Sequence, residues 1–401
     1  MSVTRSVRLG DLIEDISAGV SLQGENRPPT SGEVGILTLS ALSGTHLDPT
    51  ACKAVSRDLV PKLGPSPQAG TILISRSNTP DLVGSCVYVE SDIPDRYLPD
   101  LIWEIKIRPD VQCDGRWLTE YLRSSQGRRN LLRAAAGTSG SMIKLSMDRL
   151  RRLRVMVPPV DVQEAVVTSG SHLDRIAATL SSLIATKGTF KRGLMQQLLT
   201  GRKRFPQHDG QPWRKVSLGE MCTLVNGHVF REEDWTTEGL PIIRIANLNG
   251  SPDFDYFSGD PDPAWTIRSG DLLFAWSGTR GTSFGPFIWR SGTAVLNQHI
   301  FKVTPRAGVD KLWFYQMLRF LTVQIERRAH GGSGIVHVRK SDLERQEVLL
   351  PTLAEQQCIA HVLQLAESEV DQLIHLRELF DRQKSALLSR LHLGEISVSP
   401  S

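Results

Sequence analysis

The amino-acid sequence contains one set of short segments twice, in the same order. The distance between the two copies of a segment falls steadily along the chain, from 209 residues to 200, 196 and 193. One duplication followed by small loop changes produces such a trend, and the repeat is far longer than the roughly 20–50 residues of a solenoid unit. The sequence therefore predicts two similar, domain-sized halves. The matching segments are Val7–Leu12 and Val216–Met221, Gly70–Leu73 and Gly270–Leu273, Trp117 and Trp313, Leu122-Arg123 and Leu318-Arg319, Pro158 and Pro351, and Gln163 and Gln356.

The basic residues are clustered although the chain as a whole is only mildly basic. A length of 401 residues suits two domains that each bury a core. The formal net charge of +4 favours a polyanionic partner weakly, so the distribution of charge says more than the sum. The clusters are equally consistent with solvated faces. They comprise Arg128-Arg129, Arg133, Lys144, Arg149, Arg151-Arg152 and Arg154, and then Lys187, Lys191-Arg192 and Arg202-Lys203-Arg204.

Cysteine spacing and hydropathy indicate the compartment. The five cysteines lie far apart and form no C-x-x-C pair, which predicts neither a disulfide framework nor a zinc site. The N-terminus has no apolar signal core, and no apolar run approaches the ~20 residues of a membrane helix. We therefore expect a cytoplasmic protein without a metal site or a membrane contact. The cysteines are Cys52, Cys86, Cys113, Cys222 and Cys358.

Each half changes character once, at a proline. Residues 1–157 and 215–350 are rich in Gly, Pro, Ser and Thr and contain short β-type runs, which predicts an α+β fold. After Pro158-Pro159 and after Pro351 the composition becomes helical. The β-type runs are Thr71–Ile74, Cys86–Val89, Ile102–Ile105, Ile242–Ile245 and Leu272–Ala275.

Apolar residues then follow a heptad pattern in both halves. Heptad stripes are typical of helices packed as a coiled coil. A stretch of ~37 residues at ~1.5 Å each would span roughly 55 Å, which disfavours the alternative that the helix only packs on its own globular domain. The stripe residues are Val166, Leu173, Leu180 and Leu194 with Ile176, Leu183 and Phe190, and then Ile359, Ala366, Leu373, Phe380 and Leu387 with Val362 and Leu376.

Connectivity predicts how these parts are joined. If the second helix packs antiparallel on the first, the chain returns towards its start in a quasi-circular, pseudo-twofold arrangement. The predicted parts are a first globular domain at 1–157, helical spacers at 158–201 and 351–393, a linker at 202–214, a second globular domain at 215–350 and a tail at 394–401.

The sequence shows no catalytic signature. It has no G-x-x-x-x-G-K-[ST] phosphate loop, and its Pro-Pro doublets lack the Asp or Asn and the aromatic residue of a base-flipping methyltransferase loop. Pro99–Lys106 resembles the P-D…E-x-K of a metal-dependent nuclease. On one strand, however, Asp100 and Glu104 would lie about 13 Å apart, too far to share one divalent ion.

The repeated motifs resemble those of a known family, the specificity subunits of type I restriction-modification systems. Each half opens with V-x-L-G-[DE], carries a G-[DT]-[IL]-L strand and a Gly/Ser-rich loop, and enters the helix through P-x-x-x-x-Q. The most family-specific stretch is Leu194–Arg202 followed by Phe205-Pro206 and Trp213. The second half departs at its end, where Leu391–Glu395 replaces Leu198–Arg202. The Gly/Ser-rich loops are Gly137–Gly140 and Gly331–Gly334.

The resemblance implies sequence-specific recognition of double-stranded DNA without catalysis. Each half would read one part of a bipartite target through the major groove, and the two helices would set the gap. The helices would also dock two methyltransferase subunits, which bring S-adenosylmethionine, in a complex with two restriction subunits, which bring ATP and Mg. The alternatives are a restriction enzyme with fused recognition domains, which the missing motifs disfavour, and a specificity partner of another methylase-based phage defence system.

Side chains that can read or approach DNA lie at expected loop tips in both halves. Asn and Gln pair with adenine, Arg pairs with guanine, and Lys and Arg contact phosphates; ordinary turn chemistry is the alternative for each. The candidates are Arg76, Ser77, Asn78, Thr79, Arg128, Arg129, Ser139 and Lys144 in the first half, and Asn247, Asn249, Ser277, Thr279, Arg280, Asn297, Gln298, His299, His337 and Arg339 in the second. Leu363, Val370 and Ile374 are expected on an apolar flank of the second helix that partner subunits cover.

Overall fold

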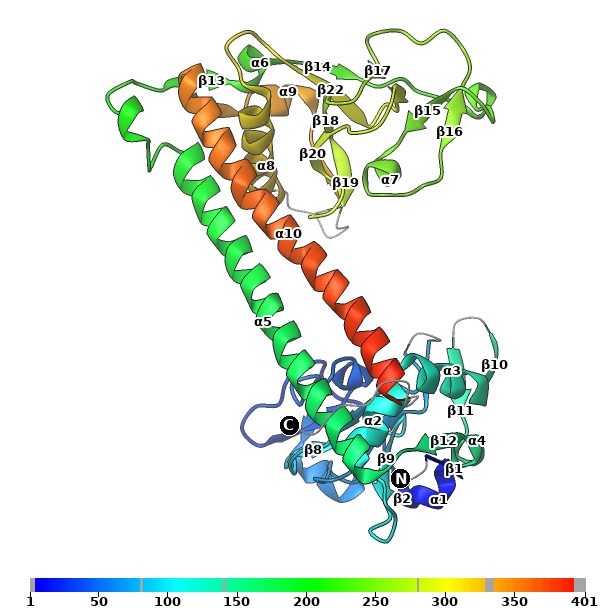
Figure 1. Ribbon diagram of the computed structural model, residues 1–401. Helices are drawn as coiled ribbons and strands as arrows, with labels where there is room; N and C mark the ends of the chain where they lie inside the picture. The colour runs from blue at the N-terminus through cyan, green and yellow to red at the C-terminus, as the bar shows by residue number, and fades with distance from the viewer. Residues whose placement is uncertain (1–3, 80–81, 140–141, 280, 329–334, 393–401) are drawn as a thin grey trace. The chain divides into compact units, whose positions relative to one another are not determined.

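The computed structural model describes residues 4–79, 82–139, 142–279, 281–328 and 335–392. The chain divides into two compact units (Figure 1). Unit 1 comprises Met1–Ser182 with His375–Ser401, and unit 2 comprises Leu183–Ile374. Within the described ranges no helix is both long and apolar enough to span a membrane.

Unit 1 is built around a four-stranded sheet of order β2-β9-β5-β7. A three-stranded sheet β4-β3-β8, a small sheet β10-β11-β6 and a two-stranded ribbon β1-β12 complete it. Its strands are β1 Arg5–Arg8, β2 Ile13–Ala18, β3 Glu33–Leu37, β4 Cys52–Ser56, β5 Ile72–Ser75, β6 Ser77–Asn78, β7 Cys86–Tyr88, β8 Arg96–Tyr97, β9 Ile102–Ile107, β10 Ala135–Ser139, β11 Met142–Leu145 and β12 Arg154–Val157. Its helices before α5 are α1 Leu9–Leu12, α2 Gly115–Arg123, α3 Ser125–Ala134 and α4 Met147–Arg152, with 3-10 turns η1 Leu39–Leu42 and η2 Arg57–Lys62.

Unit 2 repeats this plan with a four-stranded sheet of order β14-β22-β18-β20. A second sheet β16-β15-β21-β17 and the ribbons β19-β23 and β13-β24 accompany it. Its strands are β13 Arg214–Ser217, β14 Cys222–Asn226, β15 Leu240–Ile243, β16 Asp255–Phe257, β17 Thr266–Ile267, β18 Leu272–Ala275, β19 Ser277–Thr279, β20 Gly285–Ile288, β21 Ala294–Leu296, β22 Ile300–Pro305, β23 Ile335–His337 and β24 Glu347–Leu350. Its other elements are η3 Pro206–His208, α6 Leu218–Met221, η4 Glu232–Asp234, α7 Ile245–Leu248, α8 Lys311–Arg328 and α9 Lys340–Glu344.

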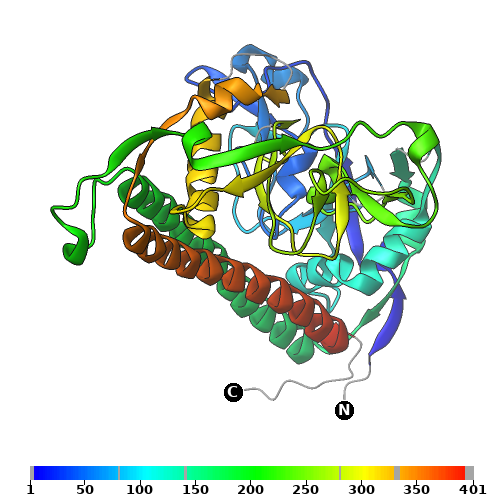
Figure 2. The ribbon, with the colours of Figure 1, turned by 90° about the horizontal axis from the view of Figure 1, so that it is seen from above.

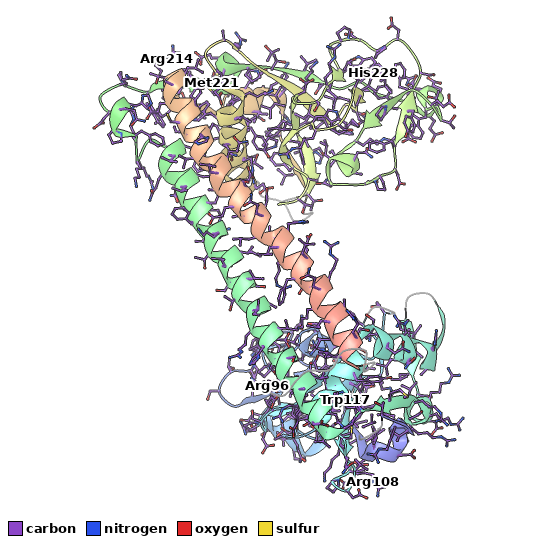
Figure 3. The ribbon with its side chains drawn as sticks, viewed as in Figure 1. Arg96, Arg108, Trp117, Arg214, Met221 and His228 are labelled. Atoms are coloured by element: carbon purple, nitrogen blue, oxygen red, sulfur yellow. The ribbon has the colours of Figure 1, made fainter. Side chains whose placement is uncertain are left out.

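The two units share one topology, which confirms the predicted α+β fold and its duplication. In both, the first strand of the central sheet pairs antiparallel with the last, as β2 does with β9 and β14 with β22. The second sheet in both contains one parallel pair, β3 with β8 and β15 with β21. Equivalent large side chains fill the two cores: Trp117, labelled in Figure 3, and Trp313 are both fully buried.

Two long helices follow the globular parts. α5 runs from Val160 to Leu199 and α10 from Leu353 to His392, each 40 residues long. In each unit their segments lie side by side and antiparallel (Figure 1 and Figure 2). Lys191 of α5 pairs with Glu367 of α10 in unit 2, and Asp174 of α5 pairs with Lys384 of α10 in unit 1. Asp174 and Glu367 are 193 residues apart, and so are Lys191 and Lys384. The same ion pair therefore occurs twice, with the acid and the base on exchanged helices.

The heptad stripes are buried only in part. Val166 and Ile359, near the helix starts, are fully buried against the globular parts. The companion positions Ile176 and Phe190 are 47% and 58% exposed. The second stripe of α5 is therefore largely exposed to solvent.

A buried glutamine explains the P-x-x-x-x-Q motif. The side chain of Gln163 accepts a hydrogen bond from the Asp114 backbone N–H (2.7 Å) and donates to the carbonyl oxygens of Pro158 (2.8 Å) and Gln112 (3.2 Å). Gln356 makes the same three bonds in unit 2, with Asp310, Pro351 and Gly308. Both side chains are fully buried, so losing the amide would leave three backbone groups unpaired.

The linker of unit 2 is fixed by a buried carboxylate. Glu355, at the start of α10, is fully buried. It accepts hydrogen bonds from Arg204 Nε (2.9 Å) and Nη2 (2.6 Å) and from the indole N–H of Trp213 (2.7 Å). Gly201, with a φ of 71°, ends α5 in the left-handed conformation that glycine adopts easily. The family-specific stretch after Leu194 thus ends the first helix and attaches the linker to the second.

Glu367, on α10, contacts side chains of two other helices. Burial opposes ionisation of its carboxyl group, but the charges of Arg319 and Lys191 and hydrogen bonds from Arg319 and Gln316 outweigh burial and lower its pKa. Arg319 and Gln316 lie on α8 and Lys191 on α5, so one carboxylate joins three helices of unit 2.

We predict that Glu367→Gln makes the free energy of unfolding less dependent on pH in acid. A carboxyl group with a lowered folded pKa stabilises the fold above its unfolded pKa of about 4.3, and this contribution is lost as the pH falls through the folded value. The wild type should therefore lose stability more steeply than the variant between about pH 5 and pH 3, measured by urea unfolding. Asp371→Asn, on the same helix at an exposed position, measures the effect of removing one surface carboxylate. Equal slopes for the wild type and Glu367→Gln would contradict the prediction.

Candidate nucleic-acid interface

In unit 1, strand pairing brings together candidates that are far apart in the sequence. β6 pairs antiparallel with β11, so that Ser77 lies opposite Lys144 and Asn78 lies opposite Ile143. β11 pairs in turn with β10, where Ser139 lies opposite Met142. The small sheet β10-β11-β6 therefore gathers Ser77, Asn78, Ser139 and Lys144, and Lys144 is exposed.

Unit 2 makes the equivalent pairing with different side chains. β19 pairs antiparallel with β23, so that Ser277 lies opposite His337 and Thr279 lies opposite Ile335. Thr279 and His337 are exposed and Ser277 is half-buried. Lys144 and His337 occupy the same place in the repeat, because each lies opposite the serine that opens the paired strand. Two candidate interfaces thus share a backbone frame and differ in chemistry.

One residue turns the chain from the central sheet into the small sheet in each unit. In unit 1 this residue is Arg76, whose backbone N–H donates to Leu101 O just before β9 (2.9 Å). In unit 2 it is Trp276, whose backbone N–H donates to His299 O just before β22 (3.2 Å). The carbonyl of the same residue accepts from Leu145 N–H (2.7 Å) in unit 1 and from Val338 N–H (3.0 Å) in unit 2. The corner is therefore built from the same hydrogen bonds, with an arginine in one unit and a tryptophan in the other.

The side chains at this corner are partly used by the fold. The guanidinium of Arg76 lies 5.7 Å from the ring centre of Trp103, a cation–π distance, and Arg76 is half-buried. Ser77 is fully buried, and its hydroxyl has no hydrogen-bond partner among the described residues. Ser77 therefore cannot reach a base unless β6 shifts, whereas Thr79 is exposed at the end of the same segment.

Aromatic packing replaces the arginine in unit 2. The centre of the Trp276 ring lies 5.2 Å from the ring centre of the exposed His299 and 6.0 Å from that of Phe301. The indole N–H of Trp276 donates to Gln298 O (3.0 Å). The side-chain oxygen of Gln298 is buried without a partner in the described part of the chain. Asn297, in the same turn, is half-buried, so His299 is the candidate of this turn that lies at the surface.

Asn247 and Asn249 are used locally. Asn247 Oδ1 accepts from the Arg244 backbone N–H (2.9 Å), and its Nδ2 donates to Asp253 O (2.7 Å). Asn249 Nδ2 donates to Ile245 O (2.8 Å). Their amides hold the short helix α7 and the turn after it, which is the turn chemistry expected of asparagine after a strand. Both ends of the Asn247 amide are thus engaged within unit 2, so reading of a base by Asn247 would require these hydrogen bonds to be exchanged.

Of the residues predicted to contact phosphates, some are used by the fold and others are exposed. Arg128, half-buried on α3, donates to Val83 O and so supports the turn after β6. Arg129 is exposed and donates to Gln126 Oε1 (2.8 Å). Lys144, on β11, and Arg339, at the start of α9, are exposed. Arg280, Gly140 and the loop Gly331–Gly334 lie outside the described residues.

The nuclease-like segment has a structural explanation. Glu104, on β9, is buried and accepts hydrogen bonds from Gln68 N–H (2.9 Å) and the Thr71 hydroxyl (3.0 Å). At the equivalent position on β22, Lys302 Nζ donates to Thr266 O (2.6 Å). Glu104 thus ties the loop before β5, and Lys302 ties β17, which precedes β18, with acceptor and donor roles exchanged. Among the described residues no group of three or more His, Cys, Asp or Glu is placed to hold a metal ion.

The three residues of α10 that were predicted to contact a partner differ in how far they are exposed. Leu363 is fully buried in the core of unit 2, so the expectation that it needs a partner's cover is wrong: α8 and the sheet already cover it. Val370 is half-buried and Ile374 is 41% exposed. The sequence pattern did not identify Leu365, which is 57% exposed on the same helix.

Comparison with known proteins shows which family the chain is similar to. Residues 210–376 match the model of the type I restriction modification DNA specificity domain. The chain is 21% identical over 345 residues to the putative type I restriction enzyme MjaX specificity subunit of Methanocaldococcus jannaschii, covering 82% of this chain and 79% of that one. It is 25% identical over 197 residues to the EcoBI specificity subunit of Escherichia coli, covering 47% and 40%.

Solved structures share the fold. A chain from "Structural basis underlying complex assembly and conformational transition of the type I R-M system" aligns with a TM-score of 0.64 at 19% identity, over 97% of both chains. The type I restriction-modification S subunit from M. genitalium aligns with a TM-score of 0.53 at 16% identity, over 97% of this chain and 96% of that one. Together with the sequence matches, these likenesses confirm the predicted resemblance to the type I specificity subunits, a family of non-catalytic subunits.

Proposed function

We propose that this specificity subunit reads a bipartite sequence in double-stranded DNA, one part with each unit. The observation that carries the proposal is the duplicated corner, which presents β6-β11 in unit 1 and β19-β23 in unit 2 on the same frame. Exposed Thr79 and Lys144 lie at one interface, and exposed Thr279, His299 and His337 at the other. Hydroxyl and imidazole groups can donate to or accept from base edges in the major groove, and the ammonium group of Lys144 can contact a phosphate.

The two parts of the target should differ in sequence. Base readout depends on donor and acceptor positions, and equivalent places in the two units hold Arg76 and Trp276, or Lys144 and His337. A pair of identical half-sites would need identical side chains there. The subunit would therefore recognise an asymmetric target.

The long helices would set the gap between the two parts. α5 and α10 are each one continuous helix of 40 residues, or about 60 Å at ~1.5 Å per residue, and each contributes to both units. Ion pairs hold them together in each unit, Lys384 with Asp174 and Lys187 with Glu369 (2.6 Å). A helix pair joined in this way would act as the spacer, whose length would belong to the helices and not to the base-reading strands.

The same helices would dock the catalytic partners. Several large apolar side chains on α5 and α10 are more than a third exposed, and such surfaces mark protein contacts. We infer that two methyltransferase subunits, which bring S-adenosylmethionine, cover them, and that two restriction subunits, which bring ATP and Mg, join that complex. The exposed side chains are Ile176, Leu183, Phe190, Leu353, Leu365, Ile374, Leu376, Leu379 and Leu387.

Exchange of one recognition unit tests the bipartite reading. Replacing residues 215–350 with the corresponding segment of another specificity subunit should change one part of the methylated DNA sequence and leave the other part and the gap unchanged, because the first unit and the helices are retained. The measurement is single-molecule mapping of methylated adenines in cells that express the hybrid with its methyltransferase. A change in both parts of the sequence would contradict the division of labour.

Polar substitution on the helices tests the docking surface. Phe190→Ser with Leu365→Ser should reduce co-purification of the methyltransferase subunit at least tenfold, because two side chains exposed by more than half would no longer contribute apolar area, worth roughly 1.5–3 kcal/mol for each fully covered side chain. Thermal unfolding should change little, since neither side chain is in a core. Gln364→Ser, at an exposed polar position of α10, serves as the matched control. Unchanged co-purification of a folded double variant would exclude this surface.

A further inference from the structure

Four arginines of unit 1 surround one concavity beside the candidate interface. The concavity has a volume of about 390 Å³ and is lined by Asn130, Arg133, Ala134, Arg149, Arg152, Leu153 and Arg154. These residues belong to α3, which precedes the β10-β11 hairpin in the chain, and to α4, β12 and the residue between them, which follow it. The three elements lie along one side of unit 1 (Figure 1). All four guanidinium groups belong to exposed residues, so they are available to a ligand.

The four side chains carry uncompensated charge. Arg149 donates to Ala134 O at 3.5 Å and Arg154 to the Ser6 hydroxyl at 3.2 Å, which are neutral acceptors. Over the described ranges no carboxylate forms an ion pair with Arg133, Arg149, Arg152 or Arg154. Like charges crowded without counter-charges repel one another, so the arrangement favours binding of an anion.

The equivalent surface of unit 2 is neutralised. The segment from Met147 to Pro158 corresponds to Lys340–Pro351 without a gap, so Arg149 is replaced by Asp342 and Arg154 by Glu347. Arg345, which corresponds to Arg152, is paired with Asp342 (2.6 Å), and Lys215 is paired with Glu347 (2.6 Å). The same backbone elements thus carry an unpaired basic cluster in one unit and closed ion pairs in the other.

The cluster lies where a phosphate would pass if the hairpin entered a groove. α3 ends at Ala134 and β10 begins at Ala135, while β11 ends at Leu145 and α4 begins at Met147, so Arg133 and Arg149 flank the base of the hairpin. Five residues of β10 extend about 13 Å at ~3.3 Å per step, and the major groove is about 8.5 Å deep. A hairpin whose far end reaches the bases therefore leaves its base at the level of the phosphates.

We propose that Arg133, Arg149, Arg152 and Arg154 form a phosphate anchor, a contact to the DNA backbone that unit 1 has and unit 2 lacks. This inference rests on the proposed DNA-reading function. Guanidinium groups suit this role because their fork of N–H donors matches phosphate oxygens. The anchor carries no sequence information, so it makes unit 1 the larger source of salt-dependent affinity while both units select bases.

The test is the salt dependence of binding to a DNA duplex of random sequence. Arg149→Asp with Arg154→Glu gives unit 1 the residues that unit 2 already holds on the same elements, so the fold should be kept. In the complete complex with the methyltransferase subunit, the slope of log affinity against log KCl concentration should become shallower by about 2, because each phosphate contact contributes about 0.9. Arg345→Ala, which removes a guanidinium already paired in unit 2, should leave the slope unchanged.

The outcomes separate the anchor from its alternatives. If the charge-reversed protein melts early, Arg149→Gln with Arg154→Gln replaces it, with an expected change in slope of the same size. An unchanged slope in a folded variant overturns the anchor. Loss of the methyltransferase subunit with an unchanged slope also overturns it and identifies the cluster as a protein contact. Absence of salt-dependent DNA binding by the wild-type complex would instead remove the proposed function itself.

Discussion

Two buried glutamines hold the globular parts to the long helices, and the rest of the architecture depends on them. Gln163 and Gln356 each satisfy one backbone N–H and two backbone carbonyls where the chain passes from a proline into a helix. An amide is the side chain that can donate and accept at one buried place without charge. Because each glutamine contacts the loop before α2 or α8 as well as its own helix, it fixes the direction in which α5 or α10 leaves its unit.

Duplication has kept the frame of the two units and changed the chemistry placed on it. The corner hydrogen bonds of Arg76 and Trp276 are the same, although one side chain is a cation and the other an aromatic ring. Glu104 accepts where Lys302 donates, and each ties its strand to the segment that precedes β5 or β18. A frame held by backbone hydrogen bonds tolerates such exchanges, since the side chain enters only as a donor, an acceptor or a packing volume. Two binding surfaces of different specificity can thus arise from one ancestral unit.

The sequence was sufficient to predict the α+β class, the duplication and the two long helices, because these follow from periodic patterns and from matching segments. The register that brings Ser77 opposite Lys144 joins residues far apart in the chain, and no local pattern encodes it. The heptad pattern also could not predict how deeply each apolar side chain is buried. Leu363, on the expected flank, is fully buried, whereas Phe190, in the stripe, is 58% exposed. The local use of Asn247 was equally open from the sequence, because an amide that can read adenine can also cap a short helix. The arginine cluster was visible as a run of charge, but only the fold shows that Arg149 and Arg154 share a concavity and that no carboxylate of the described residues pairs with them.

The central claim is that one chain reads two different DNA sequences at a fixed separation. The most direct measurement is genome-wide mapping of methylated adenines by single-molecule sequencing, in cells with the intact gene and in cells from which it has been deleted. The account predicts one asymmetric motif of two unlike parts with a constant gap between them, methylated only when the gene is present. A single uninterrupted motif, a palindrome of two identical parts, or methylation that persists after deletion would contradict it.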